Sequence, residues 1–311
     1  MSKLTVSVAP HIHSGSSTRK VMLDVVIAML PAAAASVFLF GVKALLILLT
    51  CVLSAVVTEF LFNLALKKEQ TVTDLSAVVT GLLLGLNLPT AVPFWQCAVG
   101  SIFAILVVKC LFGGLGQNIV NPAIAARVFM LLAFAATMGG NDPVRSFGGV
   151  ELATGATPLA AFKNAEIADP SLLTLLFGTH GGCIGETCAI ALILGYIYLV
   201  ARKVIRWYVP AVFVATVFVC YFAATGDVMS ATYQVLAGGL LLGAIFMATD
   251  YVTTPISDMG RVLFALGAGL LTFAIRYWGS YPEGVSIAIL SMNLLSPTLE
   301  KLTRKTPLGG V

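Results

Sequence analysis

Two threonines beside a glycine and a proline stand out in the run ELATGATPLA, residues 151–160. Gly155 frees the backbone, and Pro158 prevents a helix from running back through Thr157. The hydroxyls of Thr154 and Thr157 therefore belong to a turn of small residues. From the residues alone, this pattern is most typical of an ordinary Thr/Gly/Pro turn.

A second polar run, QNIVNPAIAAR at residues 117–127, joins a glycine-rich turn to an apolar stretch. Asn118 and Asn121 carry amides, and Arg127 carries a guanidinium. A helix N-terminus offers unpaired N–H groups to polar ring atoms, and amides can donate to and accept from the pyrimidine edge of a flavin. The same residues also suit a helix cap with a proline near the first helical position, and both interpretations stay open.

Ionisable side chains also occur in or at the ends of the apolar stretches, where a charge is costly and is a functional candidate by default. We expect four of them to be candidates for an ion pathway: Asp24, Glu59, Glu186 and Asp250. Asp250 belongs to a third polar run, FMATDYVTTP at 246–255. This run could instead be an ordinary polar turn at the exit of an apolar segment. Like Asp250, Asp74 could simply cap the end of a helix.

Histidine and cysteine do not indicate a metal centre. His11 and His13 could bind a metal, but two isolated histidines in a polar tail are usually solvated. The six cysteines contain no Cys-x-x-Cys pair, which argues against an iron–sulfur site made by this chain alone. Cys183 and Cys188 could form a disulfide outside the membrane, although two reduced packing residues are the simpler interpretation. No nucleophile and base of a catalytic triad are recognised either.

The composition is that of an integral membrane protein. Hydrophobic residues make up 59% of the chain and charged residues 10%, and the mean hydropathy is +0.98. The net charge of +4 is too small to indicate nucleic-acid binding, and no basic–aromatic stripe is present. We therefore expect a lipid bilayer as the surrounding medium and no nucleic acid as a partner.

Hydropathy predicts an all-α protein of about ten transmembrane segments, five before and five after a polar island at 139–185. The third segment is only 75–88, too short for a bilayer core of ~30 Å, and it predicts a half-helix or broken helix. The chain then divides into a tail (1–20), a first repeat (21–138), the island, a second repeat (186–300) and a tail (301–311). The segments are 21–40, 44–66, 75–88, 94–112 and 123–138, then 186–200, 209–225, 233–249, 262–277 and 285–299.

Threading the chain through these segments places thirteen Lys and Arg residues on the side of the N-terminus and four on the other, with Arg127 inside. The positive-inside rule then predicts that both termini are cytoplasmic and that Thr157 is extracytoplasmic. The motif GLLLG occurs at 81–85 and again at 239–243, in the third segment of each half. Because each half has an odd number of segments, the second repeat must be inverted, and a functional pathway is expected at the interface of the repeats.

The runs described above resemble a known family. Glu151-x-x-Thr154-Gly155-Ala156-Thr157 is similar to the D-x-x-[ST]-G-A-T signature, in which a flavin transferase esterifies the phosphate of FMN onto the last threonine. That signature belongs to the RnfD proteins of the Rnf ferredoxin:NAD oxidoreductase complex and to the NqrB proteins of the sodium-pumping NADH:quinone reductase. Residues 14–19, 117–127 and 246–255 also resemble this family. Glu151 stands where the family usually has Asp.

The resemblance implies a redox carrier of a bacterial or archaeal cell membrane, with FMN covalently bound at Thr157. It implies electron transfer coupled to the translocation of sodium or protons in a complex with other subunits, among them a second covalent-FMN subunit and iron–sulfur subunits. In the quinone-reductase relative, the equivalent of 117–127 lies near a second, non-covalent flavin, so Asn118 and Asn121 are expected to hold riboflavin. The chain length favours RnfD over NqrB, and a cofactor-free channel or secondary transporter is the alternative of another class.

Overall fold

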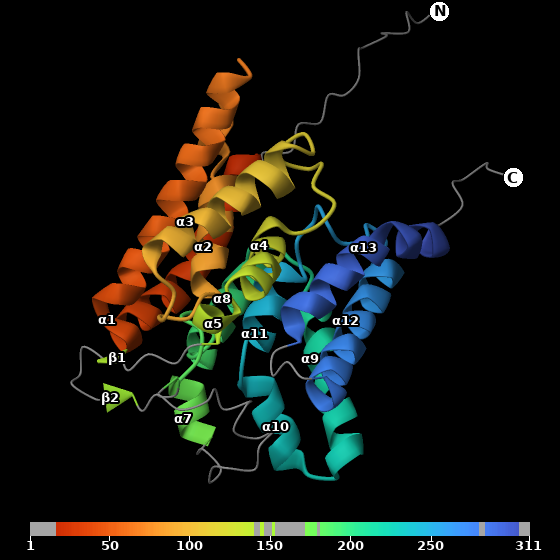
Figure 1. Cartoon of the computed structure of the whole chain (residues 1–311). Coiled ribbons are helices and arrows are strands. Elements are labelled where there is room, and N and C mark those ends of the chain that lie inside the picture. Colours follow the sequence, from red (N-terminus) through yellow and green to blue (C-terminus); the bar gives the residue numbers. More distant parts are fainter. Residues whose placement is uncertain are drawn as a thin grey trace, which may run out of the picture.

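The structure is a computed structural model that describes residues 17–139, 144–145, 151–152, 172–178, 181–279 and 284–304 (Figure 1). Helices make up almost all of it, as expected. The strands in the described part are β1 (Val144–Arg145) and β2 (Glu151–Leu152), which pair antiparallel with Val144 opposite Leu152. This short hairpin is a departure from an all-α chain, and it lies within the expected polar island.

The first helix, α1 (Thr18–Ala65), contains 48 residues and begins at Ser17, whose side chain accepts a hydrogen bond from the Lys20 N–H. At ~1.5 Å per residue it would be ~70 Å long, more than twice the bilayer core. The helix is broken at Gly41, whose φ of 71° and ψ of −161° are not helical. Gly41 can adopt this conformation because it has no Cβ. The expected segments 21–40 and 44–66 are therefore the two arms of α1.

The remainder of the first half consists of short helices. The 3₁₀ turn η1 (Val72–Asp74) leads into α2 (Ser76–Leu86), whose 11 residues are about half the length of a bilayer crossing. Then α3 (Phe94–Ile102) continues as a π-helix, η2 (Phe103–Cys110), and α4 (Pro122–Ala133) is followed by α5 (Ala135–Met138). The prediction of a half-helix at the third segment is confirmed by α2.

The second half begins with α7 (Leu172–Phe177), α8 (Ala189–Ala201) and α9 (Tyr208–Thr225). A broken segment follows, in which α10 (Val228–Leu236) and the unit of α11 (Leu240–Leu242) and π-helix η3 (Gly243–Met247) are bent by 63°. The last helices are α12 (Asp258–Trp278) and α13 (Val285–Thr303). The expected sixth segment starts at Ala189, because residues 181–188 form an irregular turn.

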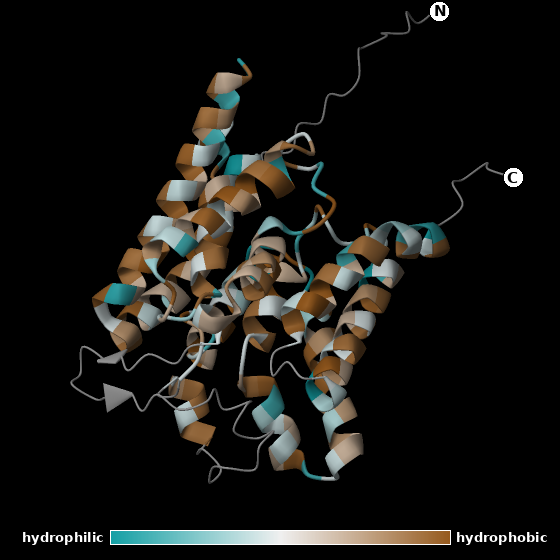
Figure 2. Ribbon diagram, viewed as in Figure 1, coloured by the Kyte–Doolittle hydropathy of each residue, from teal (hydrophilic) through white to brown (hydrophobic). Residues whose placement is uncertain are grey.

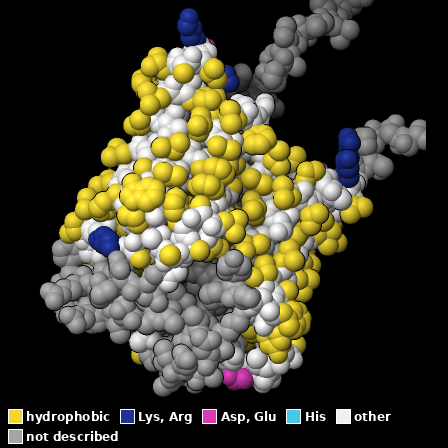
Figure 3. All heavy atoms as spheres, viewed as in Figure 1, with side chains coloured by type: hydrophobic (Ala, Val, Ile, Leu, Met, Phe, Trp, Pro, Cys, Tyr) yellow, Lys and Arg dark blue, Asp and Glu magenta, His cyan; other side chains and the backbone are white. Residues whose placement is uncertain are grey.

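By length and composition, three helices of the described part are long and apolar enough to cross a membrane, or four if the bent pair counts as one span. These are α1, α9 and α12, and four shorter apolar helices accompany them. Hydrophobic residues recur along all the long helices (Figure 2), and on the face drawn in Figure 3 the described surface is mostly apolar, with its few Lys and Arg side chains near the edges. A membrane protein is thus confirmed in outline, whereas ten spans in inverted repeats stay a prediction.

Two groups of helices face each other, with α1, α2 and α3 on one side, α9, α12 and α13 on the other, and α4, α8 and α11 between them (Figure 1). Backbone hydrogen bonds join the irregular turns at the centre, from Ile184 N–H to the Leu88 carbonyl (2.9 Å) and from Gly185 N–H to the Leu86 carbonyl (2.7 Å). The interrupted backbone of one half therefore satisfies that of the other, as buried polar groups require.

The two ends of the molecule differ in which elements they contain. Asp24 near the start of α1 binds Arg202 at the end of α8 (3.2 Å), and the N–H of Ile256 before α12 donates to Glu300 near the end of α13 (2.8 Å). The hairpin and α7 lie at the opposite end (Figure 1). We call the end with the Asp24–Arg202 pair the Asp24 end. Its assignment to the cytoplasm stays a prediction from the charge distribution.

Candidate functional site

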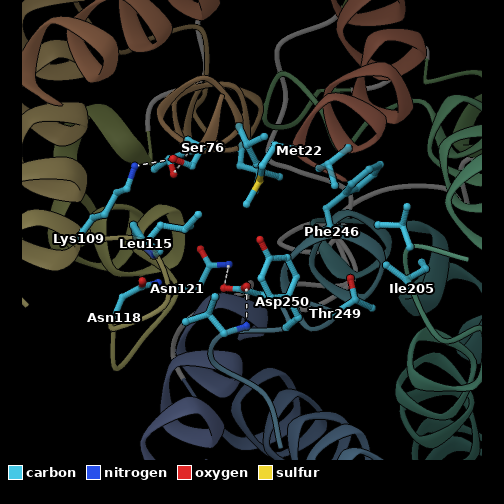
Figure 4. A pocket seen from close by; sticks show the side chains of 18 of the residues that line it. Met22, Ser76, Lys109, Leu115, Asn118, Asn121, Ile205, Phe246, Thr249 and Asp250 are labelled. Carbon is cyan, nitrogen blue, oxygen red and sulfur yellow. Dashed lines mark hydrogen bonds between the residues drawn. The ribbon is translucent and has the colours of Figure 1, made fainter. Parts of the chain in front are cut away.

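A cavity lies near the Asp24 end, where the start of α1, α2, the end of α8 and the turns before α4 and after η3 meet (Figure 4). Its volume is about 80 Å³. Apolar side chains such as Met22, Leu83 and Phe246 form much of its wall, and the polar residues that line it include Ser76, Lys109, Asn118, Asn121 and Asp250. The cavity therefore brings the second and third polar runs of the sequence together.

Asn121 links these two runs. Its Oδ1 accepts hydrogen bonds from the N–H groups of Ala123 (3.0 Å) and Ile124 (3.4 Å) and so caps α4, with Pro122 in the first turn. Its Nδ2 donates to Oδ2 of Asp250 at 3.4 Å, and the two side chains point toward each other in Figure 4. The helix-cap interpretation is thus confirmed for Asn121, whose Oδ1 caps α4. Its Nδ2 group binds Asp250, and both residues line the cavity.

Asn118 has a different role, because part of its amide is unused. The residue is 8% exposed, and its Oδ1 is buried without a hydrogen-bond partner among the described residues. Leaving a buried acceptor unsatisfied costs about 1–3 kcal/mol, so such an atom in a cavity wall is suited to a ligand that donates a hydrogen bond. Asn118 is the better of the two asparagines for ligand recognition.

Asp250 lies in the turn after η3 and is held on three sides. It accepts hydrogen bonds from the Val252 N–H (3.1 Å), the Thr253 hydroxyl (3.2 Å) and the Asn121 amide. Burial raises the pKa of its carboxyl, and these donors oppose that rise. Asp250 therefore stabilises the turn after η3, in agreement with the interpretation of residues 246–255 as an exit turn. Its carboxylate also lines the cavity.

Lys109, which lines the cavity, belongs to a buried ion pair that the sequence indicates only in part. Lys109 Nζ donates to both carboxylate oxygens of Glu59 (2.8 and 2.9 Å) and to Ser76 Oγ (2.6 Å). The side chains of Lys109 and Glu59 are 3% and 2% exposed. Glu59 is one of the expected ion-pathway candidates, whereas Lys109 is not among them and is one of the thirteen Lys and Arg residues predicted on the side of the N-terminus. Its position inside the apolar stretch 94–112 is the signal that could have found it.

Asp74 and Asp24 have structural partners. The carboxylate of Asp74 accepts hydrogen bonds from the Ser76 N–H (2.7 Å) and the Ser76 hydroxyl, so it caps the start of α2, in agreement with its alternative interpretation. Asp24 accepts hydrogen bonds from Tyr198 (2.9 Å) and Arg202. Asp24 thus joins α1 to α8 at the end of the molecule rather than in its interior.

Arg127 and Glu186 belong to a separate cluster at the centre of the molecule. Arg127 Nη1 donates to Oδ1 of Asn87, and Nη2 contacts Sγ of Cys183 at 3.5 Å. Glu186 Oε1 accepts a hydrogen bond from the Cys183 N–H at 2.9 Å. Arg127 therefore does not line the cavity that Asn118 and Asn121 line. Sequence reasoning missed Asn87 and Cys183 as site residues; the Asn-Leu-Pro that closes the half-helix is the signal for Asn87.

The cysteines of the chain are free in the structure, including Cys183 and Cys188. The disulfide alternative is thus not present in the structure, where Cys183 is buried and Cys188 is partly buried, as packing residues are. Thr154, Gly155, Ala156 and Thr157 lie outside the described residues, as do His11 and His13. Of the ELATGATPLA run, the backbone of Glu151 and Leu152 is described, in β2.

A second cavity of about 370 Å³ adjoins the first. The two share wall residues from the turn after α8 and the turn after η3, namely Val204, Ile205, Thr249 and Tyr251. The first cavity alone is smaller than the ~300–1,000 Å³ of typical small-molecule sites. A planar aromatic ligand that reached Asn118 would therefore have to displace side chains that line the first cavity.

Comparison with known proteins agrees with the motifs. Residues 5–309 match the NQR2, RnfD, RnfE family. The chain is 43% identical to the D subunit of the Na(+)-translocating ferredoxin:NAD(+) oxidoreductase complex of Acetobacterium woodii, over 98% of this chain and 95% of that protein. It is 41% identical to the D subunit of the proton-translocating ferredoxin:NAD(+) oxidoreductase complex of Clostridium ljungdahlii, over 98% and 96%.

A more distant relative, the D subunit of the ion-translocating oxidoreductase complex of Stutzerimonas stutzeri, is 37% identical over 94% of this chain and 93% of its own length. These similarities extend over nearly the whole chain and confirm the resemblance to the RnfD proteins. The chain belongs to the NQR2, RnfD, RnfE family.

Proposed function

We propose that the chain is the membrane flavin subunit of an ion-translocating ferredoxin:NAD+ oxidoreductase complex. The observation that carries this proposal is full-length similarity above 40% identity to two proteins that are named as the D subunits of such complexes. The buried polar groups inside an otherwise apolar protein support it, because charges at membrane depth are retained where they serve redox or transport chemistry. One relative is named for sodium and the other for protons, so either ion could be the one coupled here.

The covalent cofactor in this proposal is FMN, held by a phosphoester to Thr157. The support is the motif itself, in which Glu151 and then Thr154, Gly155 and Ala156 precede the acceptor in the sequence. When bound, a flavin supplies one-electron and two-electron redox chemistry. The chain would provide its position at the end of the molecule opposite Asp24, where the described hairpin lies (Figure 1).

The second cofactor in the proposal is a non-covalent flavin, riboflavin, in the cavity beside Asn118. The unsatisfied Oδ1 of Asn118 would accept a hydrogen bond from a ring N–H, and the Asn121 amide would donate to a ring carbonyl. Leu83 and Phe246 would exclude water from the ring face. Lys109 would place a positive charge beside it, already balanced by Glu59.

Two variants test the covalent attachment. Thr157→Ala should abolish flavin fluorescence that survives a denaturing gel, whereas Thr154→Ala should retain it, and both require a co-expressed flavin transferase. A colourless wild-type protein would instead favour a cofactor-free channel or transporter. Covalent flavin that persists in the Thr157 variant would refute the attachment site.

The non-covalent flavin is tested by acid extraction of the purified complex. Asn118→Leu should weaken flavin binding roughly tenfold and so lower the released flavin, because the loss of one buried hydrogen bond costs about 1.4 kcal/mol. Asn121→Ser, which retains a cap for α4 but removes the amide donor, should reduce it less. Asn293→Leu is the matched control, since Asn293 is a buried asparagine that lines neither cavity. Equal losses in all three variants would refute the site.

A further inference from the structure

The second cavity has a chemistry that the proposed flavin sites do not use. Three cations line it, Lys203 and Arg206 from the turn between α8 and α9 and Arg261 from the first turns of α12. Its other walls are apolar side chains and hydroxyl groups, and no Asp or Glu lines it in the described part. We propose that this cavity binds the phosphate group of an anionic phospholipid.

The charges of Lys203 and Arg206 are available to such a ligand. The neighbouring Arg202 is already paired with Asp24, whereas the structure shows no ion pair for Lys203 or Arg206 among the described residues. Arg261 donates to the Pro255 carbonyl (3.0 Å), which orients its guanidinium, and lies 3.7 Å from Asp258. Asp258 is 74% exposed, so water screens most of its effect on Arg261.

The surroundings favour a lipid over a soluble phosphate. Trp207 follows Arg206 and is 62% exposed, and Ile256 and Met259, close to Arg261 in the chain, are 77% and 61% exposed. The Tyr208 hydroxyl donates to Asp258 at 2.5 Å, which holds the starts of α9 and α12 together on this face. Exposed Trp next to cations is typical of the headgroup level of a bilayer, and acyl chains would cover the apolar side chains.

The position also agrees with the charge distribution of the whole chain. The cavity is at the Asp24 end, to which the predicted topology assigns most of the Lys and Arg residues. Basic pockets between transmembrane helices at such an end bind anionic headgroups. Because the cavity shares Tyr251 and Ile205 with the inner cavity, a lipid seated there would also close the mouth of the inner one.

The test uses the full chain after delipidation. The protein is titrated with phosphatidylglycerol, phosphatidylcholine or inorganic phosphate, and the bound lipid is measured by native mass spectrometry. Wild type should retain phosphatidylglycerol in preference to phosphatidylcholine, and inorganic phosphate should not displace it. Lys203→Gln/Arg206→Gln should bind about 30-fold more weakly, because each Lys or Arg near a headgroup contributes a factor of about five.

The matched control is Lys67→Gln/Lys68→Gln, which removes two exposed cations that line neither cavity. Lys67 and Lys203 both have a positive φ, 52° and 57°, so the backbone perturbation is equivalent. This control should bind phosphatidylglycerol as wild type does. Equal loss in both double variants would show a diffuse charge effect and overturn the site. Displacement by inorganic phosphate, or equal retention of phosphatidylcholine by wild type, would overturn the lipid assignment even if a variant failed to fold.

Discussion

Replacement of Glu59 by Gln is expected to be among the most destabilising single changes in this chain. The carboxylate accepts two hydrogen bonds from Lys109 Nζ and one from the Thr71 hydroxyl (2.6 Å), which in turn accepts from the Asn63 amide (3.0 Å). Both charged side chains are almost fully buried. The variant keeps the volume of the side chain but leaves the ammonium of Lys109 without its counter-charge.

The magnitude follows from the burial of the partner that remains. Removing one member of a buried ion pair costs about 3–5 kcal/mol, because the other charge stays desolvated. Ser76 Oγ, at 2.6 Å from Lys109, still accepts a hydrogen bond, so the lower part of this range applies. Glu59→Leu/Lys109→Met removes both charges, and it should cost less than Glu59→Gln despite two substitutions, since only hydrogen bonds of about 1 kcal/mol each are lost.

The assay is thermal unfolding of the purified chain in detergent, followed with a dye that reacts with thiols as they become exposed. Cys51, Cys97 and Cys110 are buried and free, so they report on this half of the molecule. Arg202→Gln, at an ion pair whose arginine side chain is 58% exposed, is the control and should change the midpoint little. A Glu59→Gln midpoint equal to that of the control, or a double variant less stable than Glu59→Gln, would refute the reasoning.

Two further predictions concern topology and helix packing. A cysteine that replaces Asn164 should react with an impermeant maleimide on intact cells, because the charge distribution predicts that the Thr157 segment is extracytoplasmic. Labelling only after lysis would show that the predicted topology is inverted. Gly81→Ala should destabilise the protein by about 1–3 kcal/mol. An added Cβ would lie 2.7 Å from Val52 Cα, where α2 crosses α1, whereas at Gly139 it would meet only a carbonyl at 3.3 Å. Equal unfolding midpoints for the Gly81 and Gly139 variants would contradict this packing.

Local features of this chain are predictable from its sequence because they depend on nearby residues. The length and apolarity of 94–112 and 209–225 indicate helices, the shortness of 75–88 indicates a half-helix, and Pro122 after Asn121 indicates a helix start. Each of these features is present in α2, η2, α4 and α9. A helix satisfies its own backbone hydrogen bonds, so the segment that forms it is sufficient to predict it.

The boundary between the two halves is harder to predict from the sequence. Hydropathy begins the sixth segment at Glu186, but residues 181–188 form a turn whose N–H groups bind the carbonyls of Leu86 and Leu88. That turn exists because the end of α2 supplies acceptors from a distant part of the chain. A non-local partner of this kind leaves no periodicity in the sequence.

The surrounding medium of this protein, its family and the residue types of its polar runs all follow from the order of its amino acids. Which of those runs meet depends on how the helices pack: Asn121 with Asp250, Lys109 with Glu59, and Arg127 with Asn87 rather than with the asparagines of its own run. In a bilayer-spanning chain, buried polar groups must find partners inside the protein. Because those partners come from distant helices, their identity depends on packing, and packing is a property of the fold as a whole.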